Sequence, residues 1–465
     1  MKKIAFFCIP AHGHTNPMLP VAAKLVSRGN TVRFYSFNEF KSKIDATGAE
    51  FISCDSYLPK LTKREEAELK NVSVTEMTIQ GIRTTLAMDM FLHNEFLSFK
   101  PDVVYTDSVC FWGKLNAWKH GVPMVVSTST FAFNQMSSQY MKNSPKELAD
   151  MIFGLPKISK ELKKLKPYGY HVRSALSLAQ SDNNTDSIVY TSRHFQPYAE
   201  SFSNHYAFVG PSVFSKKEPN KEKARALIYI SLGTVINDRP DFYSRCIEAL
   251  KSLDADIIIS CGNVMDRKAL GVLPDNIQVY PYVDQPDILS KADVFITHCG
   301  MNSVSESLYM ATPLVLYPQT SEQRAVARRT VEIGAGLMLT DDSANGIRLA
   351  VQEILKNNDY RVAAKDCSVD FRSCIGTLGA AKFIENAPHL SEGVDVLSEL
   401  NKANVRFQIV YWLSIIIIIS LIGVLISWKY VWIVGVAAGI LSAPIAVSVQ
   451  KKQYASIIKK LKEKN

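Results

Sequence analysis

Two residues in the first quarter of the chain could together take a proton from an alcohol. His14 lies in the stretch 10–17, and Asp107 ends the apolar run 102–106. Imidazole has a pKa suited to general-base catalysis near neutral pH. A carboxylate beside it fixes the tautomer and stabilises the imidazolium. We therefore expect His14 to act as a base that Asp107 orients, with His12 as the rival base. Taken alone, His14 could be a structural loop histidine and Asp107 a helix N-cap.

A second group of polar residues is typical of a site for a nucleotide sugar. The β-branched and aromatic run 294–297 ends at His298 and Gly300, and 303–310 has a composition compatible with a helix. A helix that starts after such a turn directs unpaired backbone N–H groups and the positive end of its dipole at a bound diphosphate. His298 could add a hydrogen bond. Glu306, one turn further on, could accept hydrogen bonds from two ribose hydroxyls.

At these residues the chain resembles the UDP-dependent glycosyltransferases of GT-B fold, in the branch of plant secondary-product glucosyltransferases and bacterial macrolide glycosyltransferases. That family carries Trp-Val-Pro-Gln, then His-Cys-Gly-Trp-Asn-Ser, a Glu three residues later, and Asp/Glu-Gln. The spacing from His298 to Gln323 is kept here. Three residues depart from the pattern: Tyr282 replaces the base-stacking Trp, Asp284 the Pro, and Met301 the second Trp. Tyr282 can still stack on uracil, so donor binding is expected, while the preferred base stays open.

The resemblance implies a role for each matching residue. Tyr282 and Gln285 would hold the base, Glu306 the ribose, and Glu322 with Gln323 the sugar hydroxyls, while the other donor residues would surround the diphosphate. It also places the base at His14, the second His of the family's His-Gly-His-x-Asn-Pro pattern, and its orienting partner at Asp107. The full set of donor residues that it implies is Gly233, Thr234, Tyr282, Gln285, His298, Gly300, Asn302, Ser303, Glu306, Glu322 and Gln323.

The resemblance implies an inverting transfer of a hexose, with glucose expected, from a UDP-sugar to a hydroxyl of a lipophilic acceptor. It implies no cofactor and no metal, and no Asp-x-Asp metal motif occurs in the sequence. Two other functions stay open. One is a UDP-sugar epimerase of GT-B fold, and the other is a non-catalytic, membrane-anchored protein that binds UDP-sugar. The sequence has no Gly-x-Gly-x-x-Gly and no Walker motif, which argues against a nicotinamide dehydrogenase or an NTPase.

Parallel strands must position these residues. The apolar run 3–9 is typical of a buried parallel strand. Residues 17–28 read as a helix with Asn16 as N-cap, Pro17 at its first position and Gly29 beyond its end. His14 would then lie in a loop at the carboxyl end of the first strand, where open α/β sheets bind ligands. Further strand-like runs that alternate with helical segments are 31–37, 124–127, 187–191, 226–232, 256–261 and 277–280.

This alternation predicts an α/β protein with doubly wound parallel sheets, and the resemblance implies that they form two Rossmann-like domains that face a cleft, the GT-B architecture. A polar segment after residue 210 marks the boundary between them. Segments 62–100 and 142–180 are helical and charged, and the resemblance implies that such insertions shape the acceptor pocket. The expected domains are an acceptor-binding domain at 1–212, a UDP-sugar-binding domain at 222–390, a linker at 391–408, a transmembrane hairpin at 409–449 and a basic cytoplasmic tail at 450–465.

The C-terminal part changes in character. Residues 409–428 and 431–449 form two uncharged apolar runs, each long enough to cross a bilayer as a helix. The tail 451–465 carries six lysines and one glutamate, a net charge of +5 out of a formal +9 for the chain. Positive charge stays on the cytoplasmic side, so we expect two spans with the catalytic domains and the tail in the cytoplasm. A single span with an interfacial helix is the alternative.

Composition fits this interpretation without deciding it. The chain has 465 residues, of which 47% are apolar and 21% charged, as in ordinary globular proteins. Its eight cysteines are scattered without zinc-ligand spacing, which favours a reduced cytosol over a disulfide framework. No secretory signal is seen at the N-terminus. The expected partners are therefore a UDP-sugar, a hydrophobic acceptor and membrane lipid, and not nucleic acid.

Overall fold

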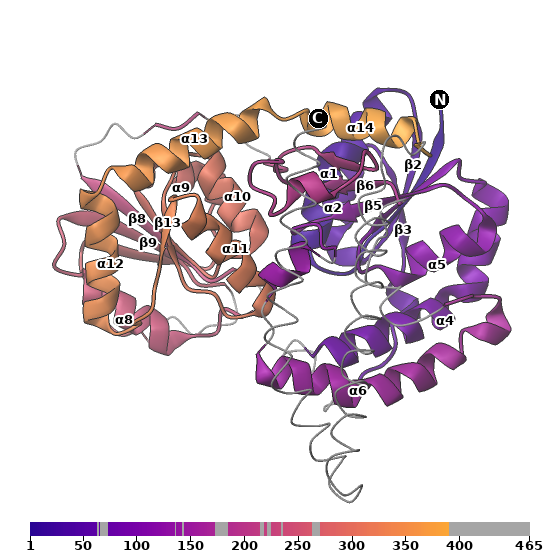
Figure 1. The fold of residues 1–465 in the computed structure, drawn as a ribbon, viewed down its shortest axis with the longest axis horizontal. Coiled ribbons are helices and arrows are strands. Elements are labelled where there is room, and N and C mark those ends of the chain that lie inside the picture. Colours follow the sequence, from indigo (N-terminus) through magenta and orange to yellow (C-terminus); the bar gives the residue numbers. More distant parts are fainter. Residues whose placement is uncertain are drawn as a thin grey trace, which may run out of the picture. The chain divides into compact units, whose positions relative to one another are not determined.

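The computed structural model describes residues 1–389, apart from 63–64, 66–72, 135, 142–143, 173–184, 214–217, 221–224, 234–235 and 263–269. These residues fall into two compact units. The larger unit comprises Met1–Pro197 and Tyr206–His389 and carries both sheets (Figure 1). Of the smaller unit the structure describes Tyr198–His205, which includes a 3-10 turn at Ala199–Ser201. Every strand and α-helix that the structure describes belongs to the larger unit.

The first sheet has seven parallel strands in the order β3-β2-β1-β4-β5-β6-β7. Phe6 of β1 pairs with Phe34 of β2 and with Tyr105 of β4, and all three rings are buried and touch. Continuous apolar runs are what parallel strands covered on both faces require. The strands are β1 Lys3–Phe7, β2 Thr31–Ser36, β3 Glu50–Ser53, β4 Val103–Asp107, β5 Met124–Thr128, β6 Ser187–Val189 and β7 Tyr206–Phe208.

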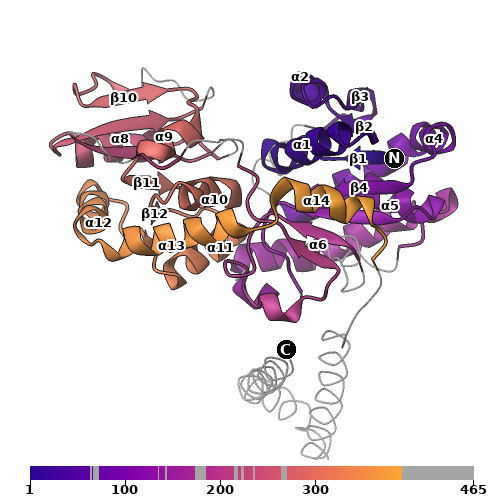
Figure 2. The same ribbon diagram turned by 90° about the horizontal axis from the view of Figure 1, so that it is seen from above.

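The helices of this half connect and cover the strands of the first sheet (Figure 2). They are α1 His12–Ser27, α2 Lys41–Asp45, α4 Val74–Phe99, α5 Phe111–His120 and α6 Pro145–Lys163. The 3-10 turns are Asn38–Phe40, Asp55–Tyr57, Ser137–Tyr140 and Lys166–Tyr168. The long helices α4 and α6 fall within the two segments that the sequence predicts to be helical.

The second sheet has six parallel strands in the order β10-β9-β8-β11-β12-β13. They are β8 Ala226–Ser231, β9 Ala255–Ser260, β10 Ile277–Tyr280, β11 Val294–Thr297, β12 Leu314–Leu316 and β13 Gly336–Met338. Their helices are α8 Pro240–Leu250, α9 Gln285–Lys291, α10 Met301–Tyr309, α11 Ser321–Glu332, α12 Ala344–Lys356 and α13 Asp359–Ser373. The predicted α/β class with two doubly wound parallel sheets is confirmed.

Both strand orders reverse once, and the reversals determine where ligands can bind. In the first sheet the chain runs outward from β1 through β2 to β3 and then returns to β4 on the other side of β1. In the second sheet the same reversal lies between the neighbouring strands β8 and β11. Open α/β sheets bind ligands at the carboxyl ends of the two strands that flank such a reversal. These ends are β1 with β4, and β8 with β11.

Helix α1 begins earlier than the sequence predicts. Its N-cap is Ala11 in an extended conformation, and the amides of His14 and Thr15 donate to the Ala11 carbonyl at 3.1 and 2.9 Å. Asn16 is therefore not the N-cap, Pro17 is not the first helical residue, and His14 lies in the first helical turn rather than in a loop. Proline is tolerated at position 17 because the Gly13 carbonyl, which an amide at position 17 would otherwise bond, accepts a hydrogen bond from Asn302 of another helix.

The last described helix, α14 at Gly376–Glu385, lies in the range expected for the second domain but packs on the first sheet. Ala380, Ala381 and Ile384 belong to the same buried cluster as the residues of β1. Glu385 bonds Arg28 at 2.8 Å and Asn30 at 2.8 Å, just after the end of α1. The chain thus returns from the second sheet to the first before residue 390.

The predicted linker, transmembrane hairpin and tail at 391–465 lie outside the described residues. Among the helices that the structure describes, none combines the length and the apolar content that crossing a bilayer requires.

Candidate functional site

His14 and Asp107 meet at the reversal of the first sheet. His14 is in the first turn of α1, directly after β1, and Asp107 is the last residue of β4 and fully buried. His14 Nδ1 lies 2.7 Å from Asp107 Oδ2, while Asp107 Oδ1 accepts the backbone N–H of Val109 at 2.9 Å. Both carboxylate oxygens are therefore held. Because an ionised carboxylate only accepts, Nδ1 carries the proton and Nε2 is the nitrogen that can act as a base.

The charge around His14 favours its protonated form. Burial lowers the pKa of His14, but the charge and hydrogen bond of Asp107, with a smaller contribution from Glu322, outweigh burial and raise it above its ordinary value. The side chain is still 29% exposed, so a substrate can reach it. Ser129 Oγ, in the segment after β5, lies 3.2 Å from Nδ1. This arrangement suits a residue that accepts a proton and passes it on.

Glu322 brings the start of α11 toward this histidine. Thr130 Oγ1 donates to Glu322 Oε1 at 2.7 Å, so the segment after β5 contacts the helix that follows β12. Burial raises the pKa of Glu322, and the Thr130 hydrogen bond and the charge of His14 oppose this only in part. Gln323 belongs to the capping box at the start of the same helix, and its Oε1 accepts the backbone N–H groups of Gln319 and Thr320. Both predicted sugar-binding residues thus lie in the first turn of α11.

The strand, turn and helix predicted around His298 are present at the reversal of the second sheet. β11 ends at Thr297, Gly300 is the N-cap of α10 without a side-chain capping bond, and α10 begins at Met301. Its first-turn N–H groups are therefore directed away from the helix, as an anion site requires. Cys299, between His298 and Gly300, has a φ of 70° and makes the turn tight.

Two glycines enclose the ring of His298. A Cβ atom on Gly233, which has a φ of 78°, would lie 2.5 Å from His298 Cε1, and one on Gly300 would lie 2.5 Å from its Nε2. Only glycine fits at either position without displacing the ring. Burial lowers the pKa of His298 to about 4, against the opposing effect of the Ser231 backbone. Without a ligand the ring therefore favours its neutral form, in which it can offer a diphosphate one hydrogen bond.

The predicted base and ribose contacts come together beside this turn. Gln285 Nε2 donates to Glu306 Oε2 at 2.6 Å and approaches Ser303 Oγ at 3.4 Å, while Tyr229 OH donates to Gln285 Oε1 at 3.1 Å. Burial raises the pKa of Glu306 to about 7, which the Gln285 hydrogen bond partly offsets. Tyr282 is 59% exposed and so has an open face for stacking. Thr234 lies outside the described residues.

Asn302 makes a contact that the sequence does not predict. Its Nδ2 donates to the backbone carbonyl of Gly13 at 2.9 Å, next to His14 in the chain. This hydrogen bond joins α10 to the helix that carries the proposed base, while the contact of Asn302 with the diphosphate stays a prediction. The sequence also misses Ser129 and Thr130. Their signal is weak, because two small hydroxyl residues after a strand are common.

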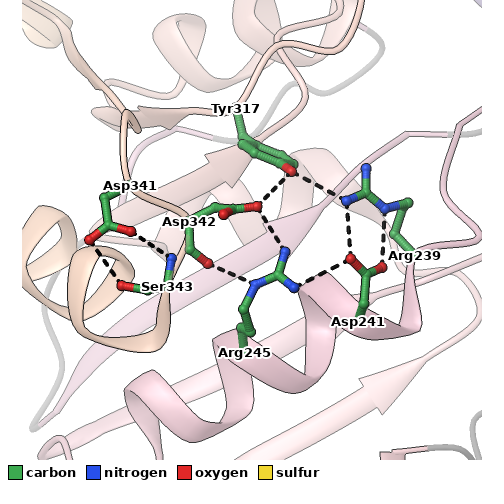
Figure 3. A network of polar contacts seen from close by, with 7 residues as sticks. All are labelled: Arg239, Asp241, Arg245, Tyr317, Asp341, Asp342 and Ser343. Atoms are coloured by element: carbon green, nitrogen blue, oxygen red, sulfur yellow. Dashed lines mark hydrogen bonds and ion pairs between the residues drawn. The ribbon is translucent and has the colours of Figure 1, made fainter.

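An ion-pair network fixes the loop that leads into α11 (Figure 3). Arg245 Nη2 bonds Asp342 Oδ2 at 2.8 Å, and the same oxygen accepts from Tyr317 OH at 3.0 Å. Arg239 pairs with Asp241 at 3.1 Å and holds the pKa of that carboxyl at about 2. The two arginines and two aspartates pair with one another, and through the Tyr317 hydroxyl they hold the start of the segment between β12 and α11. Neighbouring Asp341 accepts from the backbone N–H and hydroxyl of Ser343.

In the parts of the chain that the structure describes, no three His, Cys, Asp or Glu side chains are grouped to hold a metal ion. The predicted absence of a metal requirement remains a prediction.

Comparison with known proteins decides the family. The chain is 34% identical over 361 residues to the NDP-glycosyltransferase YjiC of Bacillus licheniformis, a match that covers 76% of this chain and 89% of that protein. The chain belongs to this family of glycosyltransferases. The predicted relationship to GT-B glycosyltransferases is thereby confirmed, and with it the assignment as an enzyme.

Three further matches agree with this assignment. Residues 244–373 match the family described as Erythromycin biosynthesis protein CIII-like, C-terminal domain. The chain is 28% identical over 401 residues to demethyllactenocin mycarosyltransferase of Streptomyces fradiae, covering 83% of this chain and 86% of that protein. The crystal structure of the calicheamicin glycosyltransferase CalG4 superposes with a TM-score of 0.68 at 25% identity, over 84% of this chain and all of that one.

Proposed function

We propose that this glycosyltransferase moves a hexose, with glucose as the expected sugar, from a UDP-sugar to a hydroxyl of a lipophilic acceptor at a membrane. The observation that carries the proposal is the 2.7 Å contact between His14 Nδ1 and Asp107 Oδ2. It leaves Nε2 of a partly exposed histidine ready to take a proton. Glu322, a proposed sugar contact, is near enough to His14 to affect its pKa.

In the proposed reaction the acceptor hydroxyl gives its proton to His14 Nε2 as its oxygen attacks the anomeric carbon. The bond from that carbon to the diphosphate breaks, and the electron pair leaves with the diphosphate oxygen. Attack on the face opposite the leaving group inverts the anomeric centre. Asp107 stabilises the imidazolium that forms. The first turn of α10 and a hydrogen bond from His298 stabilise the charge that develops on the diphosphate.

The proposed donor contacts lie in the segments that follow β10 and β11 of the second sheet. Tyr282 would stack on the base, and the pair of Gln285 and Glu306, already joined at 2.6 Å, would reorganise around base and ribose. A fold neighbour of 15% identity and TM-score 0.61, the spinosyn rhamnosyltransferase SpnG, was solved with thymidine diphosphate. A dTDP-sugar is therefore the competitor against which UDP-glucose should be tested.

The membrane part of the proposal rests on the sequence. The uncharged runs 409–428 and 431–449 have the length of two bilayer-spanning helices, joined by Lys429 and Tyr430. The lysine-rich tail would stay in the cytoplasm, and an even number of spans would place the catalytic domains on the same side. A lipophilic acceptor, which partitions into the bilayer, would then lie close to the catalytic domains.

The experiment that tests the proposal uses the full chain in its membranes with labelled UDP-glucose, dTDP-glucose and an added phenol. We expect label to enter lipid or the phenol, and His14→Ala to lower turnover by about 10² or more with UDP affinity kept. We also expect activity to survive EDTA. Conversion of UDP-glucose without an acceptor would indicate an epimerase. Donor binding without any turnover would indicate a binding protein, and loss of activity in EDTA would overturn the metal-free reaction.

A further inference from the structure

Helix α6 carries an apolar stripe on its outer face. Leu148, Ile152 and Leu155 follow one another at i, i+4 and i+7, so they lie on one side of the helix. They are 46%, 61% and 56% exposed, and the nearby Phe153 is 78% exposed. The inner side is narrow: Gly154, Ile158 and Glu161 are its buried residues. Contiguous exposed apolar surface on a folded domain marks an interaction site more often than chance.

Contacts with α4 fix the direction in which this stripe faces. The Asp150 carboxylate accepts from Ser73 Oγ at 3.0 Å and from the backbone N–H of Thr75 at 3.2 Å. Thr75 also packs on Gly154, where a Cβ atom would lie 1.9 Å from Thr75 Oγ1. The two helices lie next to each other (Figure 1). The outer face of α6 is therefore held outward by close packing on its inner face.

The charges left over on α6 are positive. Its three acidic side chains are engaged: Glu147 with Arg324, Asp150 with the start of α4, and Glu161 with Lys164. Among the described residues no ion pair is made by the lysines of the helix itself, which are Lys146, Lys157, Lys160 and Lys163. A helix with an apolar stripe flanked by unpaired lysines has the composition of helices that lie in the interface of an anionic membrane.

We propose that the outer face of α6 docks on the surface of an anionic lipid bilayer, with Leu148, Ile152 and Leu155 in the interface and the lysines on the headgroups. This deepens the proposed function and rests on it in one respect, namely that residues 409–449 hold the chain at a membrane. The lysine-rich tail indicates the same partner chemistry. In the sequence, residues 391–408 separate the described part of the chain from the first apolar run.

Docking at α6 would connect the bilayer with the donor side of the site. Glu147, in the first turn of α6, accepts from the backbone N–H of Ser321 at 3.3 Å and from Arg324 at 3.0 Å. Both partners lie in the first turn of α11 together with Glu322 and Gln323. The start of α6, next to the proposed docking face, thus contacts the helix turn that carries the proposed sugar contacts.

The test places an environment-sensitive fluorophore on Ile152→Cys in the full chain, reconstituted into vesicles of phosphatidylcholine with or without phosphatidylglycerol. Seven native cysteines are buried, so Cys374→Ser gives a clean background. Val369→Cys on α13 is the matched control, because Val369 is 63% exposed and also lies on a helix. We expect a blue shift and quenching by nitroxide-labelled lipid at position 152 and not at 369, stronger with phosphatidylglycerol and weaker in high salt.

Charge and function provide two further readouts. Lys157→Gln and Lys160→Gln should each lower the affinity for vesicles that contain phosphatidylglycerol roughly fivefold. Ile152→Glu with Leu155→Glu should slow transfer to a phenol dissolved in the bilayer and leave transfer to a water-soluble phenol unchanged. Equal fluorescence at 152 and 369, or a stripe protected by protein in the absence of lipid, would overturn the docking proposal. Absence of transfer to either phenol would instead count against the proposed function.

Discussion

Asn302 Nδ2 donates to the Gly13 carbonyl because Pro17 cannot. In an α-helix the amide of residue 17 would bond the carbonyl of residue 13, but proline has no N–H. The freed carbonyl accepts from Asn302, 289 residues away in the sequence. A proline inside α1 thus creates the acceptor that ties the proposed base to the helix of the proposed diphosphate site.

This relationship predicts opposite effects on stability and activity. Pro17→Ala restores an internal donor, so Gly13 no longer needs Asn302. We expect kcat to fall by roughly fivefold, the value of one hydrogen bond, while the melting temperature stays equal or rises. Asn302→Ala should lower kcat similarly. Pro20→Ala, also inside α1, is the control and should leave kcat unchanged; equal losses at Pro17 and Pro20 would contradict the mechanism.

The pH profile of kcat/KM should report the pairing of His14 with Asp107. Base catalysis needs neutral His14, and Asp107 raises the pKa of that imidazole, so activity is lost as pH falls through the raised value. Asp107→Asn removes the charge, which should move the acidic limb to lower pH and also lower the plateau, because the tautomer is no longer fixed. Ser129→Ala should leave the limb in place. If the acidic limb did not move in Asp107→Asn, it would report the titration of a group other than His14.

Thr130→Val should impair recognition of the sugar more than recognition of UDP. It removes the hydroxyl that donates to Glu322 and leaves a buried carboxylate without that partner. We expect kcat/KM for UDP-glucose to fall about tenfold, in the range for a lost hydrogen bond to a charged group, with UDP affinity unchanged. Thr130→Ser keeps the hydroxyl and should retain activity. Calorimetry measures the affinities for UDP and for UDP-glucose separately. Equal losses of affinity for both ligands would show that Thr130 does not act through the sugar.

Glu306 should make the unliganded fold less stable at higher pH. Its folded pKa of about 7 lies above the ordinary glutamate value of about 4.3, so the unfolded chain releases its proton first. Stability should therefore decline as pH rises between these two values and then level off. Glu306→Gln cannot ionise and should flatten that part of the curve. Thermal unfolding of both proteins across this range tests the sign; a parallel decline in the variant would show that other groups cause it.

The strands and the fold class could be predicted because buried parallel strands are continuous apolar runs, as in Lys3–Phe7 and Val294–Thr297. The spacing of the donor motif likewise placed Gln285 and Glu306 in one site, where they share a hydrogen bond. Pro17 misled the prediction of the helix start, because proline is usual at a first helical position and the compensating donor is distant in sequence. Thr130 could not be found, because nothing local indicates that the segment after β5 reaches α11.

The contrast between His298 and Tyr282 bears on how donor preference can change. The His298 ring is fixed between Gly233 and Gly300, so almost any substitution there would disturb the turn that faces the diphosphate. Tyr282, at 59% exposure, supports little of the core, so its replacement should change mainly its proposed contact with the nucleobase. Under the proposed function, substitutions at residue 282 should therefore alter the preferred nucleotide while the turn around His298 keeps its structure.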